Sequence, residues 1–447
     1  MKSCSLLFIL LCAVAHLNNC DGVVFTDKIF NVLRYGATPN GKSDGAQAFS
    51  KAWNEACGTD CGWYGSFRVR CRVLIPEGTF LVGPVSFRGP CKSPMVVQVK
   101  GLVRAPINLG NFKHKEWIAF RHVSNLLVTG LGTFDGQGRA IWPHKHGNSL
   151  PPTGGCLATG TNGGLSGDCL AVGTTGGLAA RNDDTGRLID AVGNTLKFLH
   201  VINAKIRAIT LVDSKFFHMV IGQSQHVTVL GVHITAPGNS PNTDGIHIAY
   251  SSDIRISKSR ISSGDDCVSI GPGSSNITVS KVRCGPGHGI SVGSLGKNSE
   301  DKGVNAIRVL NCTLAGTTNG VRIKTWRDSP RISATNILFS DLVMKEVSNP
   351  IIIDQEYCPN SCDEEKPASR VKIDNVRFQN IRGTSATDVA INLVCSSFVP
   401  CDHITLENIN LKPLPPSPGL APTVPLTACT NVGIAKAIGH VFPPPCF

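Results

Sequence analysis

The middle of this chain reads NTDGIHI at 242–248, GDDCVSI at 264–270, GPGHGISV at 285–292 and GVRIKTW at 320–326. Asp244, Asp266 and His288 follow one another at intervals of 22 residues, and the triplets IHI, VSI and ISV after them keep the same interval. A fixed interval of this length is typical of repeat proteins, in which each repeat stacks on the one before it.

The repeat extends on both sides of these blocks. One series of short strands begins at residues 227, 254, 277, 307 and 337, and a second begins at 246, 268, 290, 321 and 351. This pattern predicts an all-β solenoid, a parallel β-helix whose coils stack about 4.8 Å apart. A β-sandwich built from hairpins is the alternative, but it needs more two-residue Asn-Gly or Asp-Gly turns and leaves the fixed interval unexplained.

Residues 1–22 have the layout of a secretory signal peptide. Lys2 precedes an apolar run at 6–15, which is too short to span a bilayer, and a mostly polar stretch follows. We expect cleavage between about residues 15 and 22, because the signal layout ends there. No later segment has 18 consecutive apolar residues, so we expect a secreted protein with no membrane association.

The chain contains 18 cysteines, which agrees with an oxidising compartment. Many of them stand in close pairs in the sequence: Cys57/Cys61, Cys358/Cys362 and Cys395/Cys401. We expect disulfides to staple loops at these pairs, and zinc sites at the first two are the alternative. Sequons at Asn276 and Asn311 permit N-glycosylation of an exported protein.

We expect one β-helix domain at 23–411 with a short capping helix near its start. Apolar residues at helical spacing between Ala46 and Ala56 predict that helix, beginning near Ser43-Asp44. A Gly- and Thr-rich segment at about 147–193 lacks strand periodicity and is interpreted as an irregular insertion, which a Cys156–Cys169 bridge would tie.

The last part of the chain, 412–447, is rich in proline. We interpret it as an extended tail that a disulfide between Cys429 and Cys446 would hold.

The formal net charge is +12. Lys and Arg are scattered along the sequence rather than gathered in a basic run, and secretion removes the opportunity to meet nucleic acid, so we expect no nucleic-acid partner. An acidic extracellular polymer is the better candidate. A basic surface that is only solvated remains the alternative.

If the coils stack in register, the fixed interval brings equivalent residues of the central blocks together in one chemical site. Asp244, Asp266 and His288 would form a ladder on three successive coils, with Asp265 beside Asp266. An Asp before Gly is usually a turn residue when it stands alone. Carboxylates about 5 Å apart repel, however, and are kept together when one stays protonated or a cation intervenes. The set in register therefore indicates function.

Strand alternation turns Arg322 and Lys324 outward on the coil after His288, where they resemble a clamp for an anionic substrate. Two chemistries use such a cluster: acid/base hydrolysis of a glycosidic bond with inversion, or β-elimination with calcium bound by the acidic residues and Arg as the base. His288 favours hydrolysis, because it can hold a proton near the acid and is a poor calcium ligand. We expect neither a metal nor a cofactor.

The four central blocks closely resemble the signature blocks of polygalacturonases, the family 28 glycoside hydrolases that cut pectin. FNVLRYGA, IPEGTF, GTFDGQG and NPIIIDQEYC resemble the flanking blocks of plant members, so the resemblance covers roughly residues 28–145 and 196–410. It implies a right-handed parallel β-helix that hydrolyses α-1,4 bonds between galacturonates with inversion. It also implies an extracellular enzyme at the cell wall, with polyanionic pectin as its partner, and we expect a monomer.

The resemblance implies separate catalytic roles. Asp265 matches the general acid, Asp244 and Asp266 match the pair that activates water, and His288 matches the histidine that supports protonation of the acid.

The resemblance also implies four substrate-binding residues. Arg322 and Lys324 match the residues that hold the galacturonate carboxylate, Asn242 opens the first block, and Tyr357 matches a tyrosine that contacts substrate.

Cys267 and Cys284 match a disulfide of the family beside the site. The insertion at about 147–193 departs from the family pattern and leaves one rim of the cleft undefined. GPGHGISVGSLG and SPNTDGIHI are similar to pollen-type plant enzymes, so we favour exo-action. The alternatives are an endo-acting polygalacturonase, a calcium-dependent pectate lyase and a non-catalytic β-helix that binds the cell wall.

Overall fold

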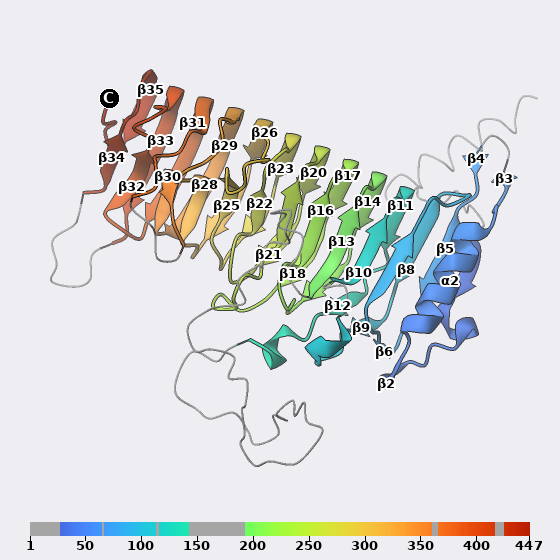
Figure 1. The fold of residues 1–447 in the computed structure, drawn as a ribbon. Coiled ribbons are helices and arrows are strands. Elements are labelled where there is room, and N and C mark those ends of the chain that lie inside the picture. Colours follow the sequence, from blue (N-terminus) through green and yellow to red (C-terminus); the bar gives the residue numbers. More distant parts are fainter. Residues whose placement is uncertain (1–26, 65–66, 113–115, 143–192, 360–364, 416–423) are drawn as a thin grey trace, which may run out of the picture.

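The computed structural model describes residues 27–64, 67–112, 116–142, 193–359, 365–415 and 424–447. The expected signal peptide and almost all of the expected insertion at 147–193 lie outside these ranges. Within them the chain is a right-handed parallel β-helix: the interval predicted the parallel β-helix, and the resemblance implied its right hand. Its coils follow one another from α2 (Ala46–Gly58) at one end to β34 (Leu426–Thr430) and β35 (Ala435–Phe442) at the other (Figure 1). The β-sandwich alternative is wrong, because the strands of both large sheets pair in parallel.

Within the described residues, one sheet of 11 strands carries the second predicted series. Its strands are β7 (Val85–Arg88), β10 (Glu116–Arg121), β13 (Asn194–Leu199), β16 (Met219–Gly222), β19 (Ile246–Ala249), β22 (Val268–Ile270), β25 (Ile290–Leu295), β28 (Asn319–Trp326), β30 (Asn349–Tyr357), β32 (Val389–Val394) and β34 (Leu426–Thr430).

The larger sheet has 22 strands in the part of the chain that the structure describes, and it carries the first series. Its strands are β1 (Lys28–Asn31), β2 (Asn40–Asp44), β5 (Cys71–Ile75), β6 (Thr79–Leu81), β8 (Met95–Val99), β9 (Leu102–Arg104), β11 (Ser124–Thr129), β12 (Thr133–Asp135), β14 (Ile202–Arg207), β15 (Thr210–Val212), β17 (Gln225–Leu230), β18 (His233–Thr235), β20 (Ser252–Ser257), β21 (Arg260–Ser262), β23 (Ser275–Ser280), β24 (Arg283–Cys284), β26 (Val304–Leu310), β27 (Thr313–Ala315), β29 (Ser333–Val347), β31 (Lys372–Ser385), β33 (Asp402–Pro413) and β35 (Ala435–Phe442).

The remaining elements are small. An antiparallel hairpin joins β3 (Trp63–Tyr64) to β4 (Phe67–Arg68), and short 3-10 helices lie at η2 (Val32–Tyr35), η3 (Leu109–Asn111) and η4 (Gly138–Ala140). No helix in the described ranges has the length and apolar character needed to cross a bilayer.

The core of the solenoid is a stack of apolar side chains in register. Ile246 pairs with Val268, Val268 with Ile290, Ile290 with Val321, and Val321 with Ile351, and all of these side chains are fully buried. The inward positions of each triplet are therefore those that strand alternation predicted. The residue between them points outward, which places the chemistry of the sheet on one external face.

The predicted capping helix is confirmed as α2 (Ala46–Gly58), which covers the blue end of the solenoid (Figure 1). The Asp44 carboxylate accepts a hydrogen bond from the Ala46 backbone N–H, which satisfies one donor of the first turn. Phe49, Ala52 and Trp53 face the core and are almost completely buried. The helix closes the apolar end of the first coil and keeps it from pairing with another chain.

The expected bridge across Cys57 and Cys61 is wrong. Cys57 lies in the last turn of α2 and pairs with Cys91, whereas Cys61 pairs with Cys71. The helix ends at Gly58 and the chain becomes extended at Thr59, so the two cysteines no longer share one helical face.

Other cysteine expectations are confirmed where the structure describes them. Disulfides join Cys395 to Cys401 and Cys429 to Cys446. Cys358 is disulfide-bonded, but Cys362 lies outside the described residues, as do Cys156 and Cys169. Among the described cysteines, Cys312 is a free, buried thiol.

The solenoid continues past residue 411, where an extended tail was expected. Strand β33 reaches Pro413, and β34 and β35 then add to the two large sheets. Prolines cluster before residue 426, and the residues after it are again compatible with strands, which explains why composition alone suggested a tail. The domain boundaries themselves stay predictions.

Candidate active site

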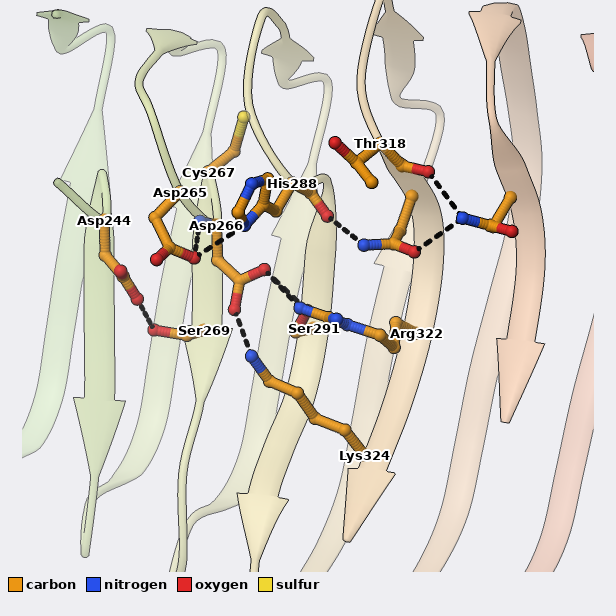
Figure 2. Close-up of polar contacts among 12 residues, drawn as sticks. Asp244, Asp265, Asp266, Cys267, Ser269, His288, Ser291, Thr318, Arg322 and Lys324 are labelled. Atoms are coloured by element: carbon orange, nitrogen blue, oxygen red, sulfur yellow. Dashed lines mark hydrogen bonds and ion pairs between the residues drawn. The ribbon is translucent and has the colours of Figure 1, made fainter. Parts of the chain in front are cut away.

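The predicted ladder lies at the start of three neighbouring strands (Figure 2). Asp244 precedes β19, Asp265 and Asp266 precede β22, and His288 precedes β25. Because β19, β22 and β25 pair in register, these four side chains lie on successive coils. The juxtaposition predicted from the 22-residue interval is present.

Asp266 is the most strongly bound carboxylate of the site and is 1% exposed. It accepts hydrogen bonds from the Ser291 hydroxyl at 2.8 Å, from the Arg322 guanidinium at 3.1 Å and from Lys324 Nζ at 2.8 Å. Burial opposes its ionisation, but Lys324 and Arg322 outweigh burial and hold the pKa of Asp266 below its ordinary value. Asp266 is therefore ionised near neutral pH.

Asp244 has the opposite environment. It is buried, and the Ser269 hydroxyl donates a hydrogen bond of 2.6 Å to its carboxylate (Figure 2). Burial raises the pKa of Asp244 well above its ordinary value, and the charges of Asp265 and Asp266 raise it further. The ladder therefore places a low-pKa carboxylate beside a high-pKa one.

Asp265 and His288 form the third pair. His288 Nδ1 lies 3.0 Å from Asp265 Oδ1, and the Asp265 side chain is 23% exposed. The hydrogen bond to Asp265 raises the pKa of His288 despite partial burial. Gly287 and Gly289 allow this approach: both have positive φ, and a Cβ at Gly287 would lie 2.7 Å from the Asp265 carbonyl oxygen.

Arg322 and Lys324 point outward as predicted, from β28. They bind Asp266 rather than standing free, and both are largely buried. Their cationic groups lie 5.6 and 5.0 Å from the centre of the Tyr357 ring. Tyr357 is thus next to the clamp, and burial raises its pKa. An anionic substrate that used this clamp would compete with Asp266.

The remaining predicted residues lie around the ladder. Asn242 adopts a left-handed backbone at φ 49°, two residues before Asp244. Cys267 and Cys284 form the expected disulfide, which ties the Asp266 turn to the strand before His288. The sequon residues Asn276 and Asn311 are both exposed. Their glycosylation stays a prediction.

Sequence reasoning missed three residues that hold the carboxylates in place. Ser269 and Ser291 bond Asp244 and Asp266, and His247 Nδ1 lies 2.8 Å from the Ser269 hydroxyl. Burial lowers the pKa of His247 to about 4, so it is neutral near pH 7. The signal was present in the sequence, because each is the outward middle residue of its triplet, in the row that continues to Arg322.

The side chains of Asp265, Asp266 and His288 also form the one grouping in the described part of the chain with the spacing of a metal site. One ligand atom from each lies within 4.8 Å of the others. Asp266 is already neutralised by Arg322 and Lys324, so the set offers a divalent cation little net negative charge.

Comparison with known proteins agrees with this geometry. The family model for glycosyl hydrolases family 28 matches residues 66–153 and 180–433. An exopolygalacturonase from Platanus acerifolia is 40% identical over 88% of this chain and 92% of its own length. A polygalacturonase from Medicago sativa is 40% identical over 90% of this chain and 85% of its own.

Solved structures share the fold at lower identity. An exopolygalacturonase from Thermotoga maritima superposes with a TM-score of 0.67 at 19% identity, covering 87% of each chain. The polygalacturonase of Erwinia carotovora gives 0.62 at 21% identity, covering 92% of this chain and 97% of that one. On the family match and the identity to the plant proteins, this chain is a glycoside hydrolase and belongs to glycosyl hydrolases family 28.

Proposed function

We propose that the protein is a secreted, monomeric hydrolase of α-1,4-galacturonosyl bonds in polygalacturonate, acting at the cell wall by inversion and without a cofactor. The observation that carries this proposal is the division of the carboxylates: two cations bind Asp266, whereas His288 binds the adjacent Asp265. Acid/base catalysis needs carboxyl groups whose environments separate their protonation states. Relatives named polygalacturonase and exopolygalacturonase support the substrate.

In the proposed reaction, Asp265 donates its proton to the glycosidic oxygen as the bond from that oxygen to C1 breaks. The leaving sugar departs with a hydroxyl group. A water molecule attacks C1 from the opposite face and gives its proton to Asp266, so the new anomeric centre is inverted. Solvent then returns a proton to Asp265, with His288 as its hydrogen-bonding partner, and Asp266 releases one.

The spacing of the carboxyl groups limits where the attacking water could lie. Carboxyl groups of inverting glycosidases usually stand roughly 6.5 to 9.5 Å apart to leave room for it, whereas ligand atoms of Asp265 and Asp266 lie within 4.8 Å. We therefore place the water on the side of Asp244, whose pKa burial raises well above its ordinary value. Asp266 then accepts the proton.

Substrate binding would make Asp266 a stronger base. A galacturonate carboxylate that engages Arg322 and Lys324 beside Tyr357 shares the cations that now hold Asp266. When Arg322 and Lys324 bind Asp266 less strongly, the pKa of Asp266 rises and it accepts a proton from water more readily. Asn242 would contact substrate from the turn before Asp244. The anionic sugar would therefore increase the reactivity of the site that cleaves it.

We favour exo-action, in which monomers leave one chain end. Relatives from Platanus acerifolia and Zea mays named exopolygalacturonase support it. The test is product analysis on a defined oligogalacturonate: monomer alone from the first time point is expected, and mixed oligomers would indicate endo-action. Proton NMR of the first product should show the inverted anomer.

The decisive variant is Asp265→Asn, which removes the proposed acid without changing the size of the side chain. We expect kcat to fall by roughly 10²-fold to 10⁴-fold. Release of reducing ends at the wild-type rate would show that the acid is assigned wrongly.

The metal-like spacing of Asp265, Asp266 and His288 favours a calcium-dependent pectate lyase as the second candidate. A lyase would form products with unsaturated ends and would stop when calcium is chelated. Saturated products formed in the presence of a chelator are expected here. A non-catalytic β-helix would release no product at all.

A further inference from the structure

Two adjoining cavities lie on the larger sheet, away from the strands that carry the ladder. Their volumes are ≈ 500 Å³ and ≈ 320 Å³, and both are lined by Arg260, Arg283 and Thr313, on strands β21, β24 and β27. Five basic side chains line one or both cavities, and we call this surface the basic groove: Lys258, Arg260, Lys281, Arg283 and Lys345. None of them belongs to the site described above.

The charge of the basic groove is uncompensated. All five cations are exposed, and none has a carboxylate within ion-pair distance in the described ranges of the chain. No acidic residue lines either cavity. The nearby sequence contains Asp341 and Glu346, but their side chains do not form part of the walls. A concave surface with one sign of charge attracts a ligand of the opposite sign.

The cations are also regularly placed. Arg260 pairs in register with Arg283, so the two guanidinium groups start from neighbouring coils about 4.8 Å apart. Lys258 and Lys281 occupy equivalent corners before these strands, both in the left-handed conformation with φ of 51° and 55°. Cations in this order suit a polymer with a carboxylate on every unit better than a single small anion.

We propose that the basic groove binds an unesterified galacturonan segment at a second site, separate from the catalytic ladder. The identity of the polymer rests on the proposed function, whereas the affinity for a polyanion rests on the groove alone. Gly285 lines the groove three residues before His288, so a polymer held there remains close to the catalytic face. Such tethering raises the local concentration of long substrates and leaves short ones unaffected.

One other occupant would exclude the polymer. Asn311 and Thr313 line the larger cavity and belong to the sequon Asn311-Cys312-Thr313. A glycan on Asn311 would fill the same space. The proposal therefore departs from the glycosylation that the sequon predicts at Asn311. It requires that the purified protein carries no glycan there, which mass spectrometry of the peptide determines.

The test compares two double variants that remove the same charge. Arg260→Gln/Arg283→Gln changes the basic groove, and Arg255→Gln/Arg308→Gln changes exposed arginines on β20 and β26 that line neither cavity. For long polygalacturonate, we expect the groove variant to raise KM roughly threefold to tenfold with kcat unchanged. For trigalacturonate neither variant should differ from wild type, and added salt should remove the difference on the long substrate.

Equal effects of the two double variants, or an equal effect on trigalacturonate, would overturn the proposal, as would a glycan on Asn311. Each double variant is also made together with Asp265→Asn, and its binding to polygalacturonate is measured. This measurement tests the second binding site separately from the proposed catalytic function. If the wild type fails to hydrolyse the polymer, the proposed function fails, yet groove-dependent binding still supports a polyanion site. Groove-dependent binding to anionic lipid vesicles but not to polygalacturonate would overturn the choice of ligand.

Discussion

The pairing of Lys324 with Asp266 makes the most specific prediction about catalysis. Replacing Lys324 with Met keeps the length and apolar stem of the side chain and removes the charge that lies 2.8 Å from the carboxylate. Two unit charges at that distance attract by about 6 kcal/mol at an effective dielectric constant of about 20. Arg322 remains, and water partly replaces the lysine, so only part of this energy is lost.

A nearby cation typically lowers a carboxyl pKa by about 1 to 3 units. We therefore expect Lys324→Met to raise the pKa of Asp266. Because the pKa of the ionised base sets the acidic limb of kcat/KM, that limb should move to higher pH. Loss of one partner of a buried pair should also lower the free energy of unfolding by about 3 kcal/mol.

The assay is the pH profile of kcat/KM on a short oligogalacturonate, with thermal unfolding measured at each pH. Lys324→Arg keeps the charge and should keep the acidic limb near its wild-type position. Lys372→Met serves as the matched control, because it breaks a partly exposed pair with Asp402 on another part of the solenoid. If the limb of Lys324→Met coincides with that of Lys372→Met, Asp266 is not the group that must be ionised.

Three further outcomes follow from the same site. Asp244→Asn should stabilise the fold increasingly as pH rises above about 4. The raised pKa of Asp244 makes the native state retain a proton that the unfolded state releases, and the variant removes this cost. A difference in Tm between variant and wild type that does not change with pH would contradict this. Ser269→Ala removes the donor to Asp244 and should lower kcat roughly tenfold with little change in KM; an unchanged kcat would show that the contact is incidental. Cys267→Ala/Cys284→Ala opens a link of sequence separation 17 and should lower the free energy of unfolding by about 3 kcal/mol in chemical denaturation; the opposite sign would rule out a stabilising role.

The coil register and the ladder were predictable because both depend on alternation and interval. Ile246, Val268 and Ile290 must face inward to be buried, and that requirement fixes where Asp244 and Asp266 stand. A slip of one residue would expose the whole apolar row. The sequence therefore determines backbone positions wherever one side of a strand is buried.

The sequence predicts less well which side chains pair with one another in disulfides and ion pairs. Cys57 pairs with Cys91 because the end of α2 and a later loop lie close together in the fold. The spacing of cysteines in the sequence does not predict this tertiary contact. The preference of Lys324 for Asp266 likewise depends on side-chain reach across two coils. Ser269 and Ser291 could have been found, because they share a row with Arg322, but a serine alone carries too little signal.

The difference in pKa between Asp244 and Asp266 arises where the repeat breaks. Asp244 and Asp266 occupy equivalent positions, so a perfect repeat would give them similar pKa values. The coil after His288 departs from it: the equivalent residue is Asn319, 31 residues further on rather than 22, and Arg322 and Lys324 follow on the same strand. These cations approach the ladder from one side only. They bind Asp266 and lower its pKa. At Asp244, burial and the charges of Asp265 and Asp266 outweigh the effects of Ser269 and Lys324, so the order of the coils sets the order of ionisation.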